Sequence, residues 1–332
     1  MSPHPAPMFD HLIRLSDDTG LLEHARGSIP LRRHGYCVDD VARGLVVVCR
    51  QPDPTAELSR LADVYLAFLL HAQADNGTFH NRLSYERTWL DPAGTGDWWG
   101  RAIWGLGTAV ARAKASHVSD PALAAFEQAL DHRSPSPRSM AFAGLGAAEV
   151  LTVIPDHPAA RRILADAVTT VGWPAPKPAW PWPQARLTYA NAALAEVLLA
   201  AGQHLEDQRM IDAGLLLLGW LLDQETTDGH LSTSPVGGWA AGEPRPGFDQ
   251  QPIEAATIAD ACARARAITA DPAWADGLAL AIGWFLGDND AKVELADWCT
   301  GGGSDGLHQT GRSDNQGAES TLALISTLQH QH

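Results

Sequence analysis

The chain has 332 residues, 45% of them hydrophobic, and a formal net charge of −15. This length allows two ordinary domains or one large core, and we expect a single domain over residues 1–332 because the helical pattern is never interrupted by a linker. The acidic balance argues against nucleic acid or an anionic membrane as a partner, since both attract basic surfaces. A neutral ligand fits such a chain better.

The cysteines and the termini exclude several other classes. Cys37, Cys49, Cys262 and Cys299 show no CxxC spacing, and no HExxH motif is present, so we expect no metal and no disulfide framework. The glycine-rich segment 300–306 lacks the lysine of a nucleotide-binding loop, so we expect no cofactor, although phosphate binding remains open.

Targeting signals are also missing from the sequence. Residues 1–8 contain no apolar run typical of a signal peptide. No stretch approaches the ~20 apolar residues that span a bilayer. We therefore expect a cytoplasmic location and no membrane partner.

Helical periodicity dominates the chain, and strand-like alternation is scarce. In chain order the pattern predicts about twelve helices, near residues 9–25, 38–49, 55–74, 97–115, 121–130, 138–151, 158–171, 187–201, 207–224, 252–268, 272–286 and 316–329.

Two kinds of helix alternate along the chain. The even-numbered ones are rich in Ala and Gly, which lets neighbours approach closely, and the odd-numbered ones are amphipathic with a charged outer face. Six inner and six outer helices describe an all-α (α/α)6 toroid, in which all inner N-termini open at one end. The alternative is an open solenoid of helical pairs, but a solenoid would show a fixed-length sequence repeat, and only the spacing is similar here.

Carboxylates lie at these predicted inner N-termini. Glycoside hydrolysis needs a protonated carboxyl for the leaving oxygen and a carboxylate that activates water or attacks directly. We predict Asp40, Asp97, Glu254 and Glu319 as the catalytic residues. Asp39 and Asp97 could instead be helix N-caps, whereas Glu254 and Glu319 lie too far into their helices for that.

Two arginines follow the first pair of aspartates. Arg43 and Arg101 lie four residues beyond Asp39 and Asp97, the spacing of an ion pair on one helix face. We expect these structural bridges to orient the carboxylates.

Aromatic and polar residues near the same ends are predicted to contact the ligand. Indole and phenol rings suit stacking on sugar faces, although core packing is an equal alternative for each ring. The predicted substrate-binding residues are His34, Tyr36, Asp39, Trp98, Arg101, Trp182, Tyr189, Asn191, Trp239, Phe248, Asp249, Gln250, Gln251, Asn315 and Gln316.

Loop histidines leave a second reaction open. His34, His80, His230 and His308 lie in predicted loops. Two opposed histidines could transfer protons on a reducing sugar, as an epimerase requires.

Five motifs together resemble one bacterial family. They are HGYCVDD at 34–40, WPW at 180–182, LTYAN at 187–191, FDQQPIE at 248–254 and NQGAEST at 315–321. That family is similar to six-hairpin glycosidases, and its members sometimes occur beside or fused to glycosyltransferases. The resemblance covers nearly the whole chain and implies a toroid, a carbohydrate substrate and a functional link to a glycosyltransferase. It implies no single reaction, because the superfamily includes hydrolases, phosphorylases and epimerases.

We therefore predict a glycoside hydrolase acting on a small or end-of-chain oligosaccharide. Asp40 or Asp97 would work with Glu254, and inversion is expected because neighbouring helix axes, about 8–10 Å apart, leave room for a water between two carboxyls. The alternatives are a sugar epimerase or isomerase, a phosphorylase, and a non-catalytic glycan-binding toroid.

Overall fold

A computed structural model describes residues 5–177 and 179–330. Half of the segment discussed above for targeting, residues 1–4, lies outside the described residues. None of the helices within the described ranges has the combination of length and apolar character needed to cross a membrane.

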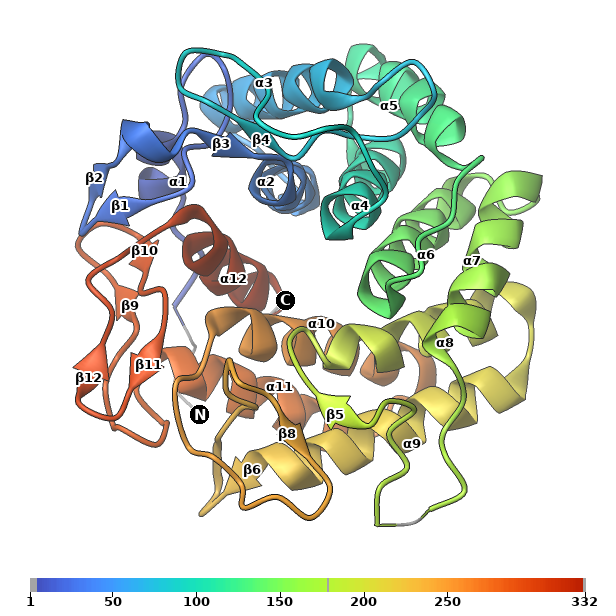
Figure 1. Ribbon diagram of the computed structural model, residues 1–332, viewed down its shortest axis with the longest axis vertical. Coiled ribbons are helices and arrows are strands. Elements are labelled where there is room, and N and C mark those ends of the chain that lie inside the picture. The colour runs from blue at the N-terminus through green and yellow to red at the C-terminus, as the bar shows by residue number, and fades with distance from the viewer. Residues whose placement is uncertain (1–4, 178, 331–332) are drawn as a thin grey trace.

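The described chain forms two rings of six helices each (Figure 1). The inner helices pack on one another in chain order, and the last, α12, packs on the first, α2, so the ring is closed. The inner ring consists of α2 (Val38–Arg50), α4 (Asp97–Arg112), α6 (Pro137–Val153), α8 (Ala192–Leu205), α10 (Pro252–Thr269) and α12 (Ala318–Gln329). The outer ring consists of α1 (Asp10–Leu15), α3 (Ala56–Ala72), α5 (Ser116–Ala129), α7 (Pro158–Val171), α9 (Gln208–Glu225) and α11 (Ala273–Phe285). The predicted (α/α)6 toroid is confirmed.

Burial distinguishes the two rings as the composition predicts. Every residue of α8 from Ala192 to Gly202 is buried, so this helix is enclosed on all sides. Outer helix α7 buries one stripe, which includes Ile163, Leu164, Ala167 and Val168, at the spacing of an amphipathic helix. The hydrophobic core therefore lies between the rings.

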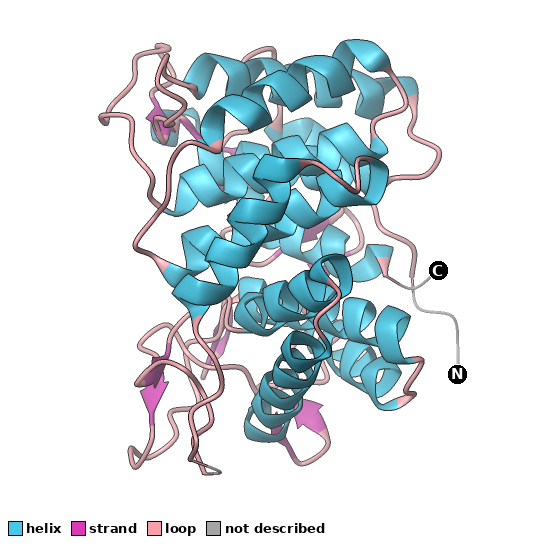
Figure 2. Cartoon of the chain, turned by 90° about the vertical axis from the view of Figure 1, so that its right-hand side faces the viewer, coloured by secondary structure: helices cyan, strands magenta, loops and turns pink. Residues whose placement is uncertain are grey.

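Short strands lie in the loops at one end of the toroid. They form six antiparallel two-stranded pairs within the long loops that lie mostly before the inner helices. Figure 2 shows most of these loops at its left, with both chain ends at its right. The strands are β1 (Ala25–Arg26), β2 (Ile29–Pro30), β3 (Tyr36–Cys37), β4 (Arg82–Leu83), β5 (Arg186–Leu187), β6 (Thr226–Thr227), β7 (His230–Leu231), β8 (Trp239–Ala240), β9 (Ala296–Asp297), β10 (Gly302–Gly303), β11 (Leu307–His308) and β12 (Gly311–Arg312), with one 3-10 turn, η1 (Arg32–His34).

Three predicted helices differ from the structure. The helix expected over 121–130 begins earlier, at Ser116, and Pro121 lies within it. The helix expected over 9–25 ends at Leu15, because the Asp17 carboxylate accepts the backbone N–H groups of Thr19 and Gly20 and turns the chain. The helix expected from residue 187 begins only at Ala192, because Ala190 has φ of 47°, which ends any helical path through that residue.

Glycines let two inner helices touch backbone to backbone. A methyl group on Gly107 of α4 would lie 2.1 Å from the carbonyl oxygen of Gly146 on α6. That oxygen belongs to a helix and cannot move independently, so only glycine allows this spacing. Gly219 on outer helix α9 differs, because an added methyl would meet no heavy atom closer than 3.9 Å.

The substitution Gly107→Ala is expected to lower the free energy of unfolding by about 1–3 kcal/mol, because the added methyl forces α4 and α6 apart. Gly219→Ala is the matched control, and it should stabilise the protein by up to about 1 kcal/mol through helix propensity. Urea unfolding followed by circular dichroism compares the two. Equal stability of both variants would contradict backbone contact between α4 and α6.

Candidate functional site

Two arginines hold the carboxylates at the N-terminal end of the inner ring. Arg43 of α2 binds Asp40 of the same helix at 2.8 Å and Glu319 of α12 at 2.7 Å. Arg101 of α4 binds Asp39 of α2 at 2.9 Å. The predicted pairing of each arginine with the aspartate four residues earlier is therefore wrong. Arg43 pairs with Asp40, which is one residue nearer than Asp39, and with Glu319 of a neighbouring helix. Arg101 pairs with Asp39 of a neighbouring helix.

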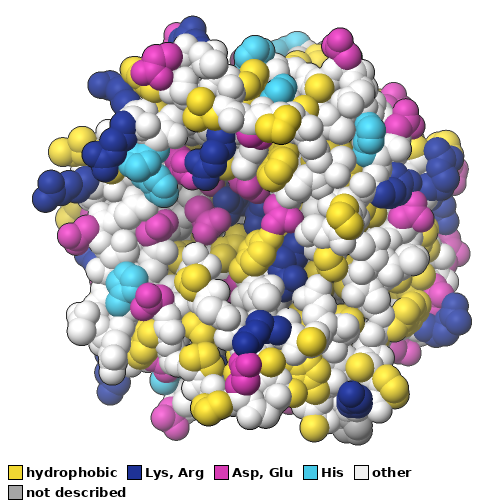
Figure 3. Space-filling model, in the orientation of Figure 1, with side chains coloured by type: hydrophobic (Ala, Val, Ile, Leu, Met, Phe, Trp, Pro, Cys, Tyr) yellow, Lys and Arg dark blue, Asp and Glu magenta, His cyan; other side chains and the backbone are white. Residues whose placement is uncertain are grey.

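The predicted catalytic carboxyls differ in accessibility. The side chains of Glu319 and Asp39 are 34% and 21% exposed, whereas that of Asp40 is 5% exposed. Glu254 is 1% exposed as a residue. Figure 3 shows a hollow near the centre of this face, in which acidic, basic and hydrophobic side chains gather. The partly exposed side chains of Asp39 and Glu319 can reach a ligand at this end of the ring, whereas Asp40 and Glu254 are almost fully buried.

The surroundings of Asp39 and Glu319 shift the pKa values of these two carboxyls in opposite directions. Burial raises the pKa of Asp39, against the opposing charges of Arg101 and Arg43, and it raises the pKa of Asp40 to about 8. Burial acts in the same sense on Glu319, but Arg43 and Arg101 outweigh it and lower the pKa of that carboxyl. The site thus combines a carboxyl whose pKa is raised, Asp39, with one whose pKa is lowered, Glu319.

Asp39 forms an ion pair with Arg101 but no hydrogen bond with it. Its Oδ1 lies 2.9 Å from Nε of Arg101 without the alignment of a hydrogen bond. Arg101 is itself buried, with its guanidinium 4.1 Å from the ring centre of Phe142, and its Nη1 has no hydrogen-bond partner among the described residues. Asp39 Oδ1 and Arg101 Nη1 are therefore buried polar atoms without a hydrogen bond among the described residues.

Asp97 joins the cluster from α4. Its Oδ1 accepts a hydrogen bond at 3.0 Å from Ser136, the N-cap residue of α6. The Asp97 charge also acts on Asp39 and Arg101, so the three groups share one electrostatic environment. Asp97 is half-buried at the rim of the hollow.

Glu254 lies behind the cluster and binds the start of α8. Its carboxyl accepts the backbone N–H groups of Ala190 and Asn191, and the Asn191 side-chain amide at 3.1 Å. Arg138 of α6 grips the same segment, donating to Asn191 Oδ1 at 2.9 Å and to the carbonyl of Tyr189. Glu254, Asn191 and Arg138 thus form a clamp, named here the α8 clamp, that fixes the loop before α8.

A second buried glutamate lies close to this clamp. Burial raises the pKa of Glu225, at the end of α9, to about 7, and burial followed by the Glu225 charge raises the pKa of Glu254 to about 8. Glu225 accepts the backbone N–H of Ser234 at 2.9 Å. Nothing in the sequence around Glu225 signals this role.

The loop held by the α8 clamp carries an aromatic wall. Trp180 lies edge-on to Trp239 and to Trp220, with ring centres 5.4 and 5.1 Å apart, and Trp182 stacks on Trp220. The indole N–H groups of Trp180 and Trp239 donate to backbone carbonyls. Only the ring faces of these half-buried residues remain for contact with a ligand.

Several predicted ligand-contact residues are buried in the structure. Tyr36, Trp182, Asn191, Gln250 and Gln316 are buried. Tyr36 donates to Asp17 at 2.7 Å, and Gln250 accepts from Trp284 at 2.8 Å. These buried side chains offer little surface to a ligand. The polar groups of Tyr36 and Gln250 form hydrogen bonds within the protein.

The other predicted contacts lie nearer the surface. Trp98, Tyr189, Phe248 and Gln251 are half-buried at the loop end. Asp249 is exposed and pairs with His308 at 2.9 Å. Asn315 binds Asp305 and His24, each at 3.0 Å.

The loop histidines fall into separate settings. His34 lies edge-on to His24, with ring centres 4.7 Å apart. His230 is held by Asp290 at 2.8 Å on the β6–β7 hairpin, and His80 stacks on Trp89. No contact between His34 and His230 is recorded among the described residues.

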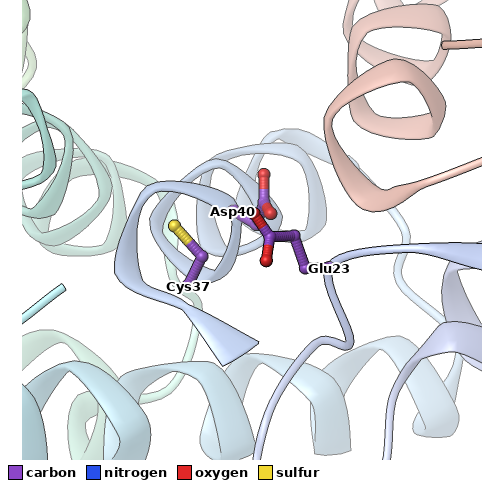
Figure 4. A group of neighbouring side chains, drawn as sticks. All are labelled: Glu23, Cys37 and Asp40. Carbon is purple, nitrogen blue, oxygen red and sulfur yellow. The ribbon is translucent and has the colours of Figure 1, made fainter. Parts of the chain in front are cut away.

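One group of side chains has the spacing of metal ligands. Ligand atoms of Glu23, Cys37 and Asp40 lie within 4.8 Å of one another, and Figure 4 shows these side chains gathered at the start of α2. Each already has a protein partner: Glu23 binds Arg82, Cys37 donates to Asn81 at 3.1 Å, and Asp40 binds Arg43. These bonds account for the group without an ion, and the expectation of no metal remains a prediction.

Comparisons with known proteins bear on the fold. No family model matches the sequence, and no curated protein matches it. Among solved structures, the cellobiose 2-epimerase of Spirochaeta thermophila aligns over 98% of this chain and 94% of its own, with a TM-score of 0.71 at 12% identity. A D-mannose isomerase aligns over 97% and 94%, with a TM-score of 0.72 at 11% identity. A GH76 α-mannanase of Bacteroides thetaiotaomicron aligns over 89% and 85%, with a TM-score of 0.60 at 12% identity. The chain has the (α/α)6 toroid fold that these epimerases, isomerases and glycosidases share.

The substitution Glu254→Gln is expected to lower the free energy of unfolding by about 1–3 kcal/mol, because an amide nitrogen would face one of the three N–H donors of the α8 clamp. The exposed Glu86→Gln variant is the control, with no expected change. Urea unfolding measures both. A Glu254→Gln protein of undiminished stability that has lost turnover would return Glu254 to the catalytic role predicted from the sequence.

Stability is expected to fall as the pH rises from about 6.5 to 8. In this window the carboxyls of the unfolded chain are ionised, whereas folded Asp40 and Glu254, with pKa values raised to about 8, keep protons. The folded state therefore binds more protons and loses stability as they leave. Urea unfolding at several pH values tests this, and Asp40→Asn should reduce the slope while the exposed Asp120→Asn should not. Stability that rises across the window would show that Asp40 is ionised in the folded protein.

Proposed function

We propose that the chain is a glycoside hydrolase in which Asp39 is the general acid and Glu319 the general base. The observation that carries this proposal is the divergence of two accessible carboxyls, one with a raised and one with a lowered pKa, beside the same two arginines. Environments that push two carboxyl pKa values apart mark the acid and base of a hydrolytic pair. Because Asp40 and Glu254 are buried, we give them positioning roles in this proposal, in place of the catalytic roles expected from the sequence.

The reaction follows from the protonation states. Asp39 donates its proton to the glycosidic oxygen as the bond from that oxygen to the anomeric carbon breaks. Glu319 accepts a proton from a water molecule whose oxygen forms the new bond to the anomeric carbon. Proton transfer through water then returns both carboxyls to their starting states.

The ion pairs support a single displacement. Glu319 is held by Arg43 and Asp39 by Arg101, so guanidinium groups stand beside each carboxyl rather than the carboxyls facing each other directly. We propose that the two carboxyls are far enough apart to admit the water that inversion requires, whereas double displacement needs them about 5–5.5 Å apart. The first product anomer is therefore opposite in configuration to the substrate.

The aromatic wall supports an oligosaccharide substrate. The half-buried faces of Trp180 and Trp239 lie on loops beside the hollow, as apolar sugar faces require. The neighbouring folds that act on sugars agree with this class of ligand. The proposed substrate is a small or end-of-chain oligosaccharide.

The variants Asp39→Asn and Glu319→Gln should each lower kcat about 10²–10⁴-fold on a natural oligosaccharide, because each removes one proton-transfer group. Asp39→Asn should recover activity on an aryl glycoside whose leaving group needs no proton, whereas Glu319→Gln should not. Asp120→Asn and Glu57→Gln, exposed positions on outer helices, are the matched controls. Proton NMR of the first product anomer, recorded before mutarotation, reads the stereochemistry. Equal recovery by both variants would contradict the assignment of acid and base, and retention would contradict single displacement.

A sugar epimerase is the second candidate function. His24 lies beside Asn315 at 3.0 Å, and its charge acts on Glu319, so a histidine and a carboxylate lie in one electrostatic environment. Such a pair could remove and return the proton next to the carbonyl of a reducing sugar. Incubation of reducing disaccharides in D2O separates the reactions. Deuterium at C2 without release of monosaccharide would favour the epimerase, and release of monosaccharide without exchange the hydrolase.

A further inference from the structure

Basic side chains gather at one edge of the hollow, although the chain as a whole carries a charge of −15. Figure 3 shows Lys and Arg side chains clustered at the upper left, over the region where Figure 1 places β1 to β4. Arg26, Arg32, Arg33, Arg82 and Arg87 belong to these segments and the turns that follow them. Five arginines therefore lie in the loops at this edge.

Part of this basic edge is already neutralised. Arg82 binds Glu23 through two hydrogen bonds of 2.7 and 2.9 Å, and Arg87 binds Asp18 at 3.0 Å. Glu23 is thus engaged, and it offers little repulsion to an incoming anion. Glu23 and Asp18 are therefore already paired with arginines, and Arg26, Arg32 and Arg33 remain.

Arg33 keeps its terminal nitrogens free. Its Nε donates to Nε2 of His34 at 3.0 Å, and among the described residues no partner is recorded for its two Nη atoms. Arg32 lies with its guanidinium 5.8 Å from the ring centre of Tyr85. Both arginines are exposed, so their terminal N–H groups can reach a ligand.

His34 links Arg33 to the proposed base. His34 lies against His24, whose ring contacts Asn315 and whose charge acts on Glu319. Because Nε2 of His34 accepts from Arg33, its other ring nitrogen carries a proton and can donate. A row of contacts therefore runs from the surface at Arg33 through His34 and His24 to Asn315, four residues before Glu319 in the chain.

The electrostatic environment of His34 agrees with a basic edge. Partial burial, followed by the charges of His24 and Arg33, lowers the pKa of His34. Burial, the largest of these causes, disfavours a charge of either sign on the ring, and the charges of His24 and Arg33 disfavour the protonated form in addition.

We propose that the substrate carries an anionic group, a carboxylate or a phosphate, which binds to Arg33, His34 and His24 on the sugar unit next to Glu319. This proposal rests on the proposed function and narrows it from a neutral oligosaccharide to one with a charged sugar. It revises the expectation of a neutral ligand drawn from the net charge, because the charge of the whole chain does not describe the field at one edge of a hollow. Arginine suits either oxyanion, since its fork of N–H groups matches both.

Isothermal titration calorimetry with monosaccharides tests this without any need for turnover. The probes are glucuronate, glucose 6-phosphate and glucose. We expect at least one anionic sugar to bind at least about fivefold more tightly than glucose, as one charge-assisted contact at a solvated site supplies. The preferred anion identifies the group as carboxylate or phosphate. Higher salt should reduce the preference.

The variant Arg33→Ala should reduce the ratio of anionic to neutral affinity to near unity. Arg162→Ala, an exposed arginine on outer helix α7, is the matched control and should keep the ratio. Equal affinity for all three sugars, no binding of any, or a preference that survives Arg33→Ala would each overturn the proposal. The hydrolase is tested separately, by the release of monosaccharide from neutral oligosaccharides, so one proposal can fail while the other stands.

Discussion

The ion pair between Arg43 and Glu319 is the interaction on which the site depends. It joins α2 to α12, the first and last helices of the inner ring, and the same guanidinium also holds Asp40. A closed ring requires residues from both ends of the chain to meet, and here they meet through a buried charge. Because an unpaired buried guanidinium would be costly, the carboxylates that neutralise it are fixed in place. The contact that closes the ring therefore also positions Glu319, the proposed base.

Burial gives similar carboxyls different chemistry within this small region. Asp39 and Asp40 are adjacent in sequence, but successive helical residues point in different directions. Asp39 therefore binds Arg101 of the neighbouring helix and stays partly exposed, whereas Asp40 is buried beside Arg43. Glu319 is more exposed and feels both arginines, which lower its pKa. Access to a ligand and affinity for a proton are both consequences of which face of the helix each residue occupies.

The two ends of the toroid are built differently. At the C-terminal end of the inner ring, arginines meet acids in matched pairs: Arg50 with Asp260, Arg112 with Glu149 and Arg264 with Glu196. Positive charge near helix C-termini is also favourable there. At the N-terminal end, long loops and unequal pairing leave Asp39 and Glu319 partly exposed. Matched ion pairs thus gather at one end of the ring and partly exposed carboxyls at the other.

The sequence by itself determined the alternation of small-residue and amphipathic helices, and hence the toroid and the end at which the inner carboxylates gather, because helix periodicity and residue size are local properties. The tertiary structure alone decided which carboxyls reach the hollow. Glu254 and Gln250 stand in a polar motif typical of a site, yet they bind the α8 loop and Trp284 instead. Arg101 pairs with Asp39 across helices rather than with Asp97 on its own helix. Burial and cross-helix partners depend on how distant segments pack, and no local pattern encodes that.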